Sequence, residues 1–273
     1  SGSILTVAHW HMAYFVRGSG PEPLISFHGF GQTATDYTDF AEILGGRFTL
    51  VLVNLFYHGK SHSEIDAEKD FFDEKALKKV IGVLLDRLKI ERASLMGFSL
   101  GGRICLKLIE SMPERINRAI LLAPDGLRMS SWYRFVTANR YGHALFKKTV
   151  KDPSRLIAIS GLITRLGLLN EKKHAFTLQN FNSPEKRKQV YDVWMIYRLL
   201  IPDPDTVCAQ SKRNGISIDL YFGKYDTIIP PEFGRVITSR LHSNLSVNIV
   251  DCGHQMLKRK TAEMIFLNSG SIK

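Results

Sequence analysis

The 273-residue chain lacks any long apolar run. No stretch approaches the ~20 consecutive apolar residues that a membrane-spanning helix needs, so no transmembrane segment is predicted. Internal repeats and low-complexity segments are also missing, which excludes fibrous and repeat architectures. Hydrophobic residues make up 44% and charged residues 23% of the chain, as in ordinary globular proteins. We therefore expect a soluble protein with one folded domain that carries an insertion.

Cysteine is scarce, and its spacing carries no metal or redox signal. Cys105, Cys208 and Cys252 are far apart, and none belongs to a CxxC pair. An odd number of isolated cysteines favours a reducing compartment, so we expect a cytoplasmic protein. No cofactor and no metal ion are predicted.

Short apolar runs rich in β-forming residues indicate buried parallel strands. They occupy residues 24–28, 49–55, 93–98, 117–123, 217–222 and 246–250. Helical spacing of apolar residues covers about 73–88 and 101–111, between these strands. This alternation predicts an α/β fold, with a mostly parallel central sheet covered by helices on both faces.

The alternation stops in the middle of the chain. Residues 127–213 are basic, aromatic and helix-like, and they hold 16 Lys or Arg against 6 Asp or Glu, nearly all of the net charge of +11. Pro202 and Pro204 end a helical stretch and lead back towards the core. We predict a helical cap over 127–213, inserted into a core formed by 1–126 and 214–273.

A GxSxG motif lies between a predicted strand and a predicted helix. Gly97 and Gly101 flank Ser99 at two residues on either side, where a sharp strand-to-helix turn leaves no room for side chains. Such a turn exposes the Ser99 hydroxyl and places the Leu100 amide at a helix N-terminus, where it can stabilise negative charge. Ser99 is the candidate nucleophile.

A serine nucleophile needs a base, and the base needs a carboxylate that orients it. Asp226 follows the strand predicted at 217–222, and His254 follows the strand predicted at 246–250. Since functional groups gather at the carboxyl ends of parallel strands, we expect Ser99, Asp226 and His254 to converge as a catalytic triad. The run His28-Gly29-Phe30-Gly31 follows the first strand, and the Phe30 amide is the second predicted oxyanion donor beside Leu100. His28 itself is expected to be structural.

Together these motifs resemble the α/β-hydrolase superfamily over nearly the whole chain. The matching pieces are residues 28–30, 58–61, 97–102, 222–226 and 253–254. The resemblance implies the same triad and the same two oxyanion amides. It departs at 54–61, where relatives commonly begin with an aspartate and carry a proline before the His-Gly pair. Haloalkane dehalogenases and epoxide hydrolases resemble this fold too, but they use an aspartate where this chain has Ser99.

The favoured activity is hydrolysis of a carboxylic ester or related acyl bond through an acyl-enzyme, and the basic segment favours an anionic small-molecule substrate. Residues 97–103 and 28–31 also resemble menaquinone-pathway 2-succinyl-6-hydroxy-2,4-cyclohexadiene-1-carboxylate synthases, which are lyases. In that alternative Arg103 would bind a substrate carboxylate, although Phe98 stands where those synthases often have Tyr. Hydrolysis of a C–C bond is a related alternative. A non-catalytic scaffold that binds a ligand is a third alternative.

The basic middle segment bears on partners. No nucleic-acid-binding motif accompanies the charge, so no nucleic-acid partner is predicted. Residues 130–150 combine aromatic and basic side chains, which suits peripheral contact with a membrane surface. The sequence leaves the oligomeric state open.

Overall fold

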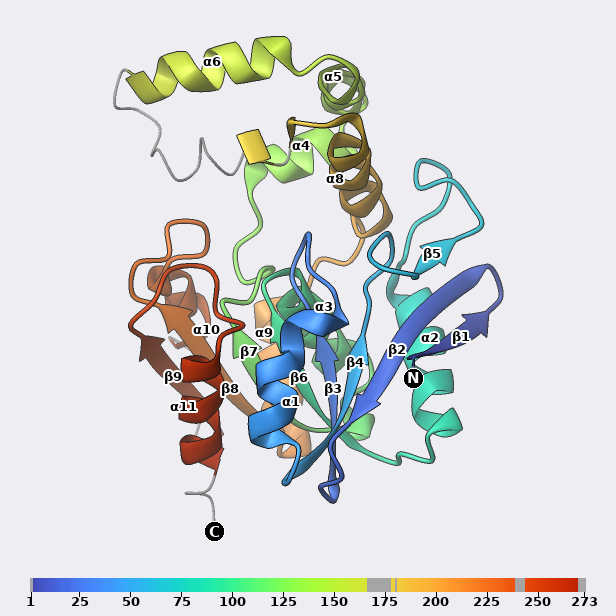
Figure 1. Cartoon of the computed structure of the whole chain (residues 1–273), viewed down its shortest axis with the longest axis vertical. Coiled ribbons are helices and arrows are strands. Elements are labelled where there is room, and N and C mark those ends of the chain that lie inside the picture. Colours follow the sequence, from blue (N-terminus) through green and yellow to red (C-terminus); the bar gives the residue numbers. More distant parts are fainter. Residues whose placement is uncertain (1, 166–177, 180, 239–243, 270–273) are drawn as a thin grey trace. The chain divides into compact units, whose positions relative to one another are not determined.

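The structure, a computed structural model, describes residues 2–165, 178–179, 181–238 and 244–269 (Figure 1). The chain forms two compact units. The first comprises Ser1–Glu64, Phe72–Arg128 and Leu200–Lys273, and the second comprises Ile65–Phe71 and Met129–Leu199.

A nine-stranded sheet forms the centre of the first unit, in the order β1-β2-β4-β3-β6-β7-β8-β9, with β5 paired to β2. The strands are β1 (Gly2–Val7), β2 (Trp10–Arg17), β3 (Glu22–Phe27), β4 (Phe48–Val53), β5 (His62–Ser63), β6 (Ala93–Phe98), β7 (Ile116–Leu122), β8 (Ser217–Gly223) and β9 (Leu245–Val250). Six of these strands pair in parallel: β4, β3, β6, β7, β8 and β9. Each of the predicted apolar runs corresponds to one of them. The predicted α/β fold is confirmed.

Helices cover both faces of this sheet. They are α1 (Thr38–Leu44), α2 (Glu74–Arg87), α3 (Leu100–Ser111), α9 (Pro204–Asn214), α10 (Arg235–Thr238) and α11 (Arg259–Ser269), with short 3₁₀ turns η1 (Ala34–Tyr37), η2 (Pro113–Arg115) and η3 (Pro231–Gly234). In Figure 1, α1 and α11 lie in front of the sheet and pack on each other, while α3 and α9 lie behind it. Helix α2 begins where Asp73 accepts the Ala76 amide at 2.8 Å, and Leu77, Ile81 and Leu84 are buried at its three- and four-residue spacing.

The N-terminal hairpin was not among the predicted strands. Strands β1 and β2 pair antiparallel, and β2 joins β4 antiparallel at one edge of the parallel sheet. Strand β1 is the edge strand and is exposed at four of its six residues, and β2 mixes His11 and Arg17 with buried Trp10 and Tyr14. The continuous apolar run that marks an interior strand is therefore missing from it.

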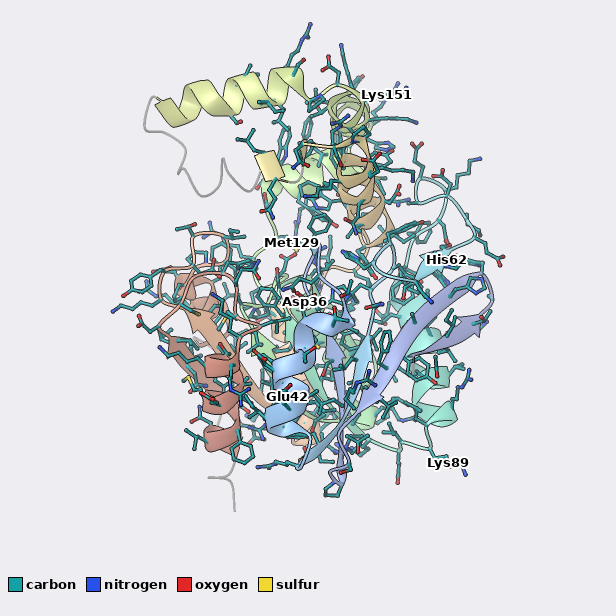
Figure 2. The ribbon with its side chains drawn as sticks, in the orientation of Figure 1. Asp36, Glu42, His62, Lys89, Met129 and Lys151 are labelled. Carbon is teal, nitrogen blue, oxygen red and sulfur yellow. The ribbon has the colours of Figure 1, made fainter. Side chains whose placement is uncertain are left out.

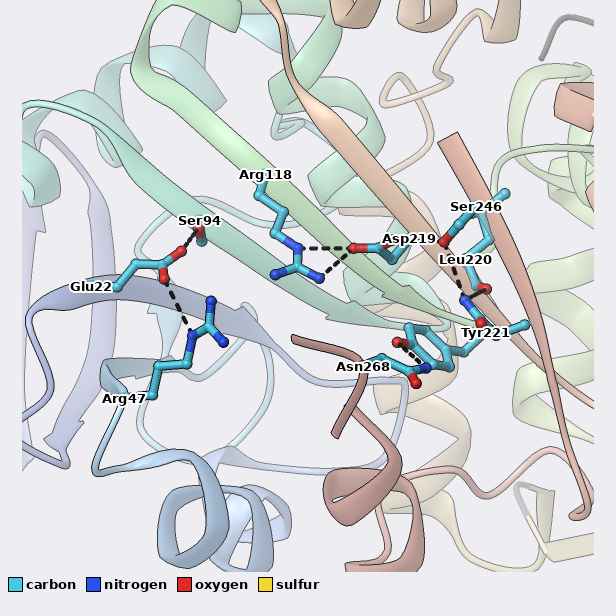
Figure 3. Close-up of polar contacts among 10 residues, drawn as sticks. Glu22, Arg47, Ser94, Arg118, Asp219, Leu220, Tyr221, Ser246 and Asn268 are labelled. Carbon is cyan, nitrogen blue, oxygen red and sulfur yellow. Dashed lines mark hydrogen bonds and ion pairs between the residues drawn. The ribbon is translucent and has the colours of Figure 1, made fainter. Parts of the chain in front are cut away.

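Polar contacts also cross the sheet between neighbouring strands (Figure 3). Arg118 of β7 donates from Nε and Nη2 to Asp219 Oδ2 of β8, at 2.8 and 2.7 Å. Ser246 of β9 donates to Asp219 Oδ1 at 2.6 Å. The buried ion pair thus has further hydrogen bonding, which a buried charge requires.

The second unit is helical. Its helices are α4 (Ser131–Ala138), α5 (Arg140–Lys151), α6 (Ser154–Arg165) and α8 (Pro184–Ile196). Tyr133 of α4, Phe146 of α5 and Trp194 of α8 form its aromatic interior, with Trp194 ring centroids 5.2 Å from Tyr133 and 5.3 Å from Phe146. Met129 at its start and Lys151 at the end of α5 are labelled in Figure 2.

A short segment from early in the chain, Ile65–Phe71, belongs to this second unit. Tyr191 donates to Glu68 Oε1 at 2.7 Å, and Lys147 Nζ lies 2.7 Å from the same oxygen. Arg198 donates to the Ala67 and Asp70 carbonyls at 3.0 and 3.1 Å. These bonds tie the segment to α5 and α8.

The unit boundaries differ from the predicted division at 126/127 and 213/214. Helix α9, which was assigned to the predicted 127–213 cap, belongs to the first unit, because it packs on α3 and buries Val207 and Cys208. The second unit ends at Leu199, just before Pro202 and Pro204. That the second unit acts as a cap stays a prediction. Among the described residues, every helix is too short or too polar to cross a bilayer.

Candidate active site

Ser99 occupies a strained turn between β6 and α3. Its φ of 51° and ψ of −112° lie where residues with side chains rarely occur. The turn is held on both sides: the Ser99 amide donates to Leu122 O at 2.9 Å, and its carbonyl accepts the amides of Arg103 at 3.2 Å and Asp125 at 2.9 Å. The fold thus imposes a backbone conformation that serine would not adopt unaided.

The two glycines of the motif are required by close backbone contacts. A Cβ on Gly97 would lie 2.5 Å from the carbonyl oxygen of Gly101, and one on Gly101 would lie 1.9 Å from the carbonyl oxygen of Phe27. Backbone atoms cannot yield at such distances. The steric reason inferred from the sequence therefore holds in the structure.

Asp226 and His254 are brought together. Asp226 follows β8, His254 follows β9, and His254 Nδ1 lies 2.7 Å from Asp226 Oδ2. The other oxygen, Oδ1, accepts the amides of Ile228 at 2.8 Å and Ile229 at 2.9 Å, and the carboxylate is fully buried. A carboxylate fixed in this way can hold the imidazole in one tautomer, with its proton on Nδ1 and Nε2 available as a base.

Ser99 lies at the same end of the sheet as this pair. It follows β6, which is separated from β8 by β7 alone, and all these strands are parallel. The ring of Phe98, next to Ser99 in the chain, has its centroid 5.1 Å from the His254 ring. The three predicted residues therefore share the carboxyl edge of the sheet.

Side chains hold the two backbone amides that flank Phe30. The Gly29 amide donates to Gln32 Oε1 and the Gly31 amide donates to His58 Nε2, both at 3.0 Å. The Phe30 amide lies between these two fixed amides, and the Leu100 amide opens α3, where a helix has no internal acceptor. Both amides predicted as oxyanion donors are thus on backbone that is anchored around them.

Two buried histidines support this loop. His28 Nε2 accepts the Leu55 amide at 3.0 Å, and its Nδ1 lies 2.7 Å from Gly29 O. Burial lowers the pKa of His28 to about 3 and the pKa of His58 to about 4. Both rings are therefore neutral at physiological pH, with the proton on Nδ1 and Nε2 accepting from the backbone. This is the structural role expected for His28.

The model of the alpha/beta hydrolase fold family matches residues 22–260. The chain belongs to this family. The matched range includes all five predicted site residues, from Phe30 to His254.

Curated relatives of this α/β hydrolase include other hydrolases. It is 22% identical over 240 residues to the uncharacterized hydrolase YugF of Bacillus subtilis, covering 87% of this chain and 85% of that one. It is 33% identical over 117 residues to a pimeloyl-[acyl-carrier protein] methyl ester esterase of Nitrosomonas europaea, covering 42% of each. It is 30% identical over 146 residues to a 2-hydroxy-6-oxononadienedioate/2-hydroxy-6-oxononatrienedioate hydrolase of Paraburkholderia phymatum, covering 52% of this chain and 48% of that one.

Solved structures agree on the fold. A thermophilic esterase from Thermogutta terrifontis superposes with a TM-score of 0.69 at 17% identity, covering 99% of this chain and 97% of the esterase. A serine hydrolase from Cycloclasticus zankles superposes with a TM-score of 0.68 at 19% identity, covering 99% and 98%. At these identities the likeness speaks for the fold alone.

Sequence reasoning on this α/β hydrolase missed two residues of the site's framework. Gln32 accepts the Gly29 amide and also donates from Nε2 to Gln255 Oε1 at 3.3 Å, which joins the Phe30 loop to the residue after His254. His58 fixes Gly31, as described above. The His-Gly pair at 58–59 was a visible signal for the second, whereas nothing in the sequence marks Gln32.

Arg103 has a partner within the protein. Its guanidinium, whose side chain is 5% exposed, forms an ion pair with Asp125, whose own amide donates to Ser99 O. A buried guanidinium already paired with a carboxylate is a poor receptor for a second one. The role that the lyase alternative assigns to Arg103 is weakened accordingly.

The described residues of this α/β hydrolase contain no group of three or more His, Cys, Asp or Glu side chains arranged to hold a metal ion.

Proposed function

We propose that the protein is a serine hydrolase that cleaves a carboxylic ester, or a related acyl bond, through an acyl-enzyme on Ser99. The observation that carries the proposal is the positive φ of Ser99, in a turn held by Leu122, Arg103 and Asp125. Strain at a non-glycine residue persists only where the surroundings enforce it, and it clusters at functional sites.

In this mechanism His254 takes the Ser99 hydroxyl proton on Nε2 while Oγ attacks the acyl carbon. The Nδ1 proton stays on His254 and is donated in the 2.7 Å hydrogen bond to the Asp226 carboxylate, which stabilises the imidazolium that forms. The Phe30 and Leu100 amides donate to the oxyanion of the tetrahedral intermediate. The alcohol departs with the proton from His254, and a water activated in the same way releases the acid.

The substrate class is the less specific part of the proposal. The esterase relative of Nitrosomonas europaea supports an ester. The excess of Lys and Arg in the second unit supports an acyl or alcohol group that carries negative charge, because guanidinium and ammonium groups bind carboxylates well.

The Paraburkholderia phymatum relative favours a second candidate, hydrolysis of a carbon–carbon bond. The same residues would act on a ketone instead of an ester carbonyl. The substrate named for that relative is the compound with which to test this candidate.

The proposal is tested with matched p-nitrophenyl esters, neutral and carboxylate-bearing, of increasing acyl length, assayed with wild type and Ser99→Ala. We expect the wild type, but not Ser99→Ala, to hydrolyse these esters, and to hydrolyse each carboxylate-bearing ester faster than its neutral match. Turnover of 2-hydroxy-6-oxononadienedioate without turnover of any ester would favour the second candidate, hydrolysis of a carbon–carbon bond. Equal activity of Ser99→Ala would overturn both candidates, and inactivity of folded wild type towards every substrate would favour a ligand-binding scaffold.

A further inference from the structure

The hairpin of helices α4 and α5 in the second unit presents large apolar side chains outward. Trp132 of α4 is 54% exposed, and Tyr141 and Leu145 of α5 are 71% and 46% exposed. Tyr141 and Leu145 are four residues apart, so they share one face of α5. Phe146 packs on the other side, against Tyr191 and Trp194, so the interior of the unit does not use the outward face.

The exposed side chains of the two helices belong to one surface element. The rings of Trp132 and Phe135 lie 5.7 Å apart on α4. The carbonyl of Phe135 comes so close to α5 that a Cβ on Gly142 would lie 2.1 Å from its oxygen. Because the helices touch at Gly142, next to Tyr141, the aromatic residues of α4 and the apolar face of α5 form a continuous hairpin.

The charges of this hairpin have a single sign. Residues 130–151 contain Arg134, Arg140, Lys147, Lys148 and Lys151 and no Asp or Glu. Lys147 pairs with Glu68 of the same unit, and Arg140 lies over the Tyr141 ring with its guanidinium carbon 5.2 Å from the centroid. Lys148, three residues after Leu145, is exposed. Lys151, at the end of α5 and labelled in Figure 2, is exposed too.

Asp152, the C-cap of α5, and Glu68, paired with Lys147, are acids next to this hairpin, and the basic residues outnumber them. An exposed aromatic and aliphatic face with such a basic margin is complementary to an anionic lipid surface. Trp and Tyr side chains lie preferentially at the headgroup level of a bilayer, and Lys and Arg near it are attracted by anionic lipids. We propose that the α4–α5 surface, formed by Trp132, Phe135, Tyr141 and Leu145 with Arg134, Arg140, Lys148 and Lys151, docks on membranes that contain anionic phospholipid. This interaction goes beyond the hydrolase activity and does not depend on it.

Vesicle co-sedimentation tests the proposal with the full chain carrying Ser99→Ala, so that no lipid ester is cleaved during the measurement. Vesicles of phosphatidylcholine mixed with phosphatidylglycerol are compared with vesicles of phosphatidylcholine alone. Since each basic residue near an anionic surface contributes about fivefold to binding, two of them contribute about 25-fold, and we expect the anionic vesicles to be bound at least that much more tightly, with the difference reduced by added salt.

Matched variants locate the surface. Lys148→Glu with Lys151→Glu should weaken binding by about 25-fold or more. Lys78→Glu with Lys79→Glu, on exposed positions of α2 in the first unit, makes the same charge change and should leave most of the affinity. Leu145→Ser should weaken binding by about fivefold, whereas Phe266→Ser on α11, equally exposed at 46%, should not.

Tryptophan fluorescence gives an independent reading of the contact. Brominated phosphatidylglycerol should quench the wild-type signal, and Trp132→Phe should abolish most of the quenching, because Trp10 is buried and Trp194 packs against Tyr133 and Phe146 in the interior of the second unit. Equal binding to both vesicle types, equal losses from the two charge pairs, or no binding by folded protein would each overturn the proposal. Binding of an oligonucleotide without vesicle binding would overturn it in favour of a nucleic-acid surface.

Discussion

The two units of this α/β hydrolase differ in where they keep their polar groups. In the first unit the notable ones are enclosed: Asp226 is fully buried, His28 and His58 are neutral beneath the Phe30 loop, and Arg118 pairs with Asp219 inside the sheet. In the second unit Asp192 is buried too, but the α4–α5 surface carries exposed lysines and arginines beside exposed aromatic rings.

This difference separates two kinds of property. Enclosed polar groups need a fixed partner, so they hold one geometry, which is what nucleophilic catalysis needs. Exposed charges have weak partners within the protein and are available to something else. The first unit is therefore suited to chemistry, and the exposed α4–α5 surface of the second unit is suited to the membrane contact that we propose for it.

The largest effect should come from removing the proposed nucleophile or base. Ser99→Ala and His254→Ala should each lower acyl-transfer turnover by roughly 10⁴-fold or more, because the reacting groups act as a unit. Steady-state kinetics on the preferred ester measures this, with circular dichroism to show that the variants fold. The double variant should be little worse than either single one; additive losses would contradict the shared mechanism.

The second prediction compares an enclosed ion pair with an exposed one. Asp219→Ala should lower the free energy of unfolding by about 3–5 kcal/mol, because it leaves the Arg118 charge buried and unpaired. Lys147→Ala, which breaks the half-exposed pair with Glu68 in the second unit, should cost about 0–1 kcal/mol. Urea unfolding measures both values.

A paired replacement serves as the control for that prediction. Arg118→Met with Asp219→Leu removes both charges and should recover most of the stability that Asp219→Ala loses. A double variant as unstable as Asp219→Ala would show that the loss of unfolding free energy has another origin than the unpaired Arg118 charge. Equal losses for Asp219→Ala and Lys147→Ala would show that burial does not distinguish the two ion pairs.

The third prediction concerns acid. His28 and His58 stay neutral in the folded chain down to about pH 3 and 4, whereas the unfolded chain protonates them near 6.5. The unfolded state thus binds more protons below pH 6.5, so the free energy of unfolding should fall by roughly 1.4 kcal/mol per pH unit for each histidine. Urea unfolding near neutral pH and near pH 5 measures the slope.

His58→Gln separates the contribution of one ring. Its side-chain oxygen can still accept the Gly31 amide, but it does not titrate, so the slope between pH 6.5 and 4 should decrease by roughly 1.4 kcal/mol per pH unit. An unchanged slope would show that His58 is not the group that acid protonates on unfolding.

The smallest effect is expected at Gln32. Gln32→Ala removes the acceptor of the Gly29 amide and should lower kcat by about tenfold with little change in KM, because the Phe30 amide loses part of its orientation. Gln32→Glu keeps an acceptor for Gly29 and should recover most of the rate. A change in KM alone would place Gln32 in substrate binding.

The interior of the fold was predictable from the sequence, and its margins were not. The parallel strands are continuous apolar runs, and the turn at Ser99 is marked by glycines whose absence of side chains has a steric cause. The β1–β2 hairpin lacks such a pattern because β1 is a largely exposed edge strand and β2 ends in exposed Val16 and Arg17. The second unit ends at Leu199 and not at the 213 predicted for the cap, because the composition of α9 resembles the basic segment while its contacts belong to the first unit.

For the site, the positions of Ser99, Asp226 and His254 after predicted strands indicated that they share one edge of the sheet. In the structure, Asp226 is hydrogen-bonded to His254. The His-Gly pair at 58–59 marked His58, but its contact with Gly31 and the contact of Gln32 with Gly29 could not be predicted, because they depend on loop geometry that no short motif describes. The partner of Arg103 was likewise hidden, since Asp125 is far from it in sequence.

Labelling with a fluorophosphonate, followed by peptide mapping, is the most direct test of Ser99 as the nucleophile. We expect a covalent adduct on Ser99 in the wild type, and none in Ser99→Ala. An adduct on a different serine, or labelling of Ser99→Ala to the same extent, would contradict the proposal that the turn after β6 carries the nucleophile.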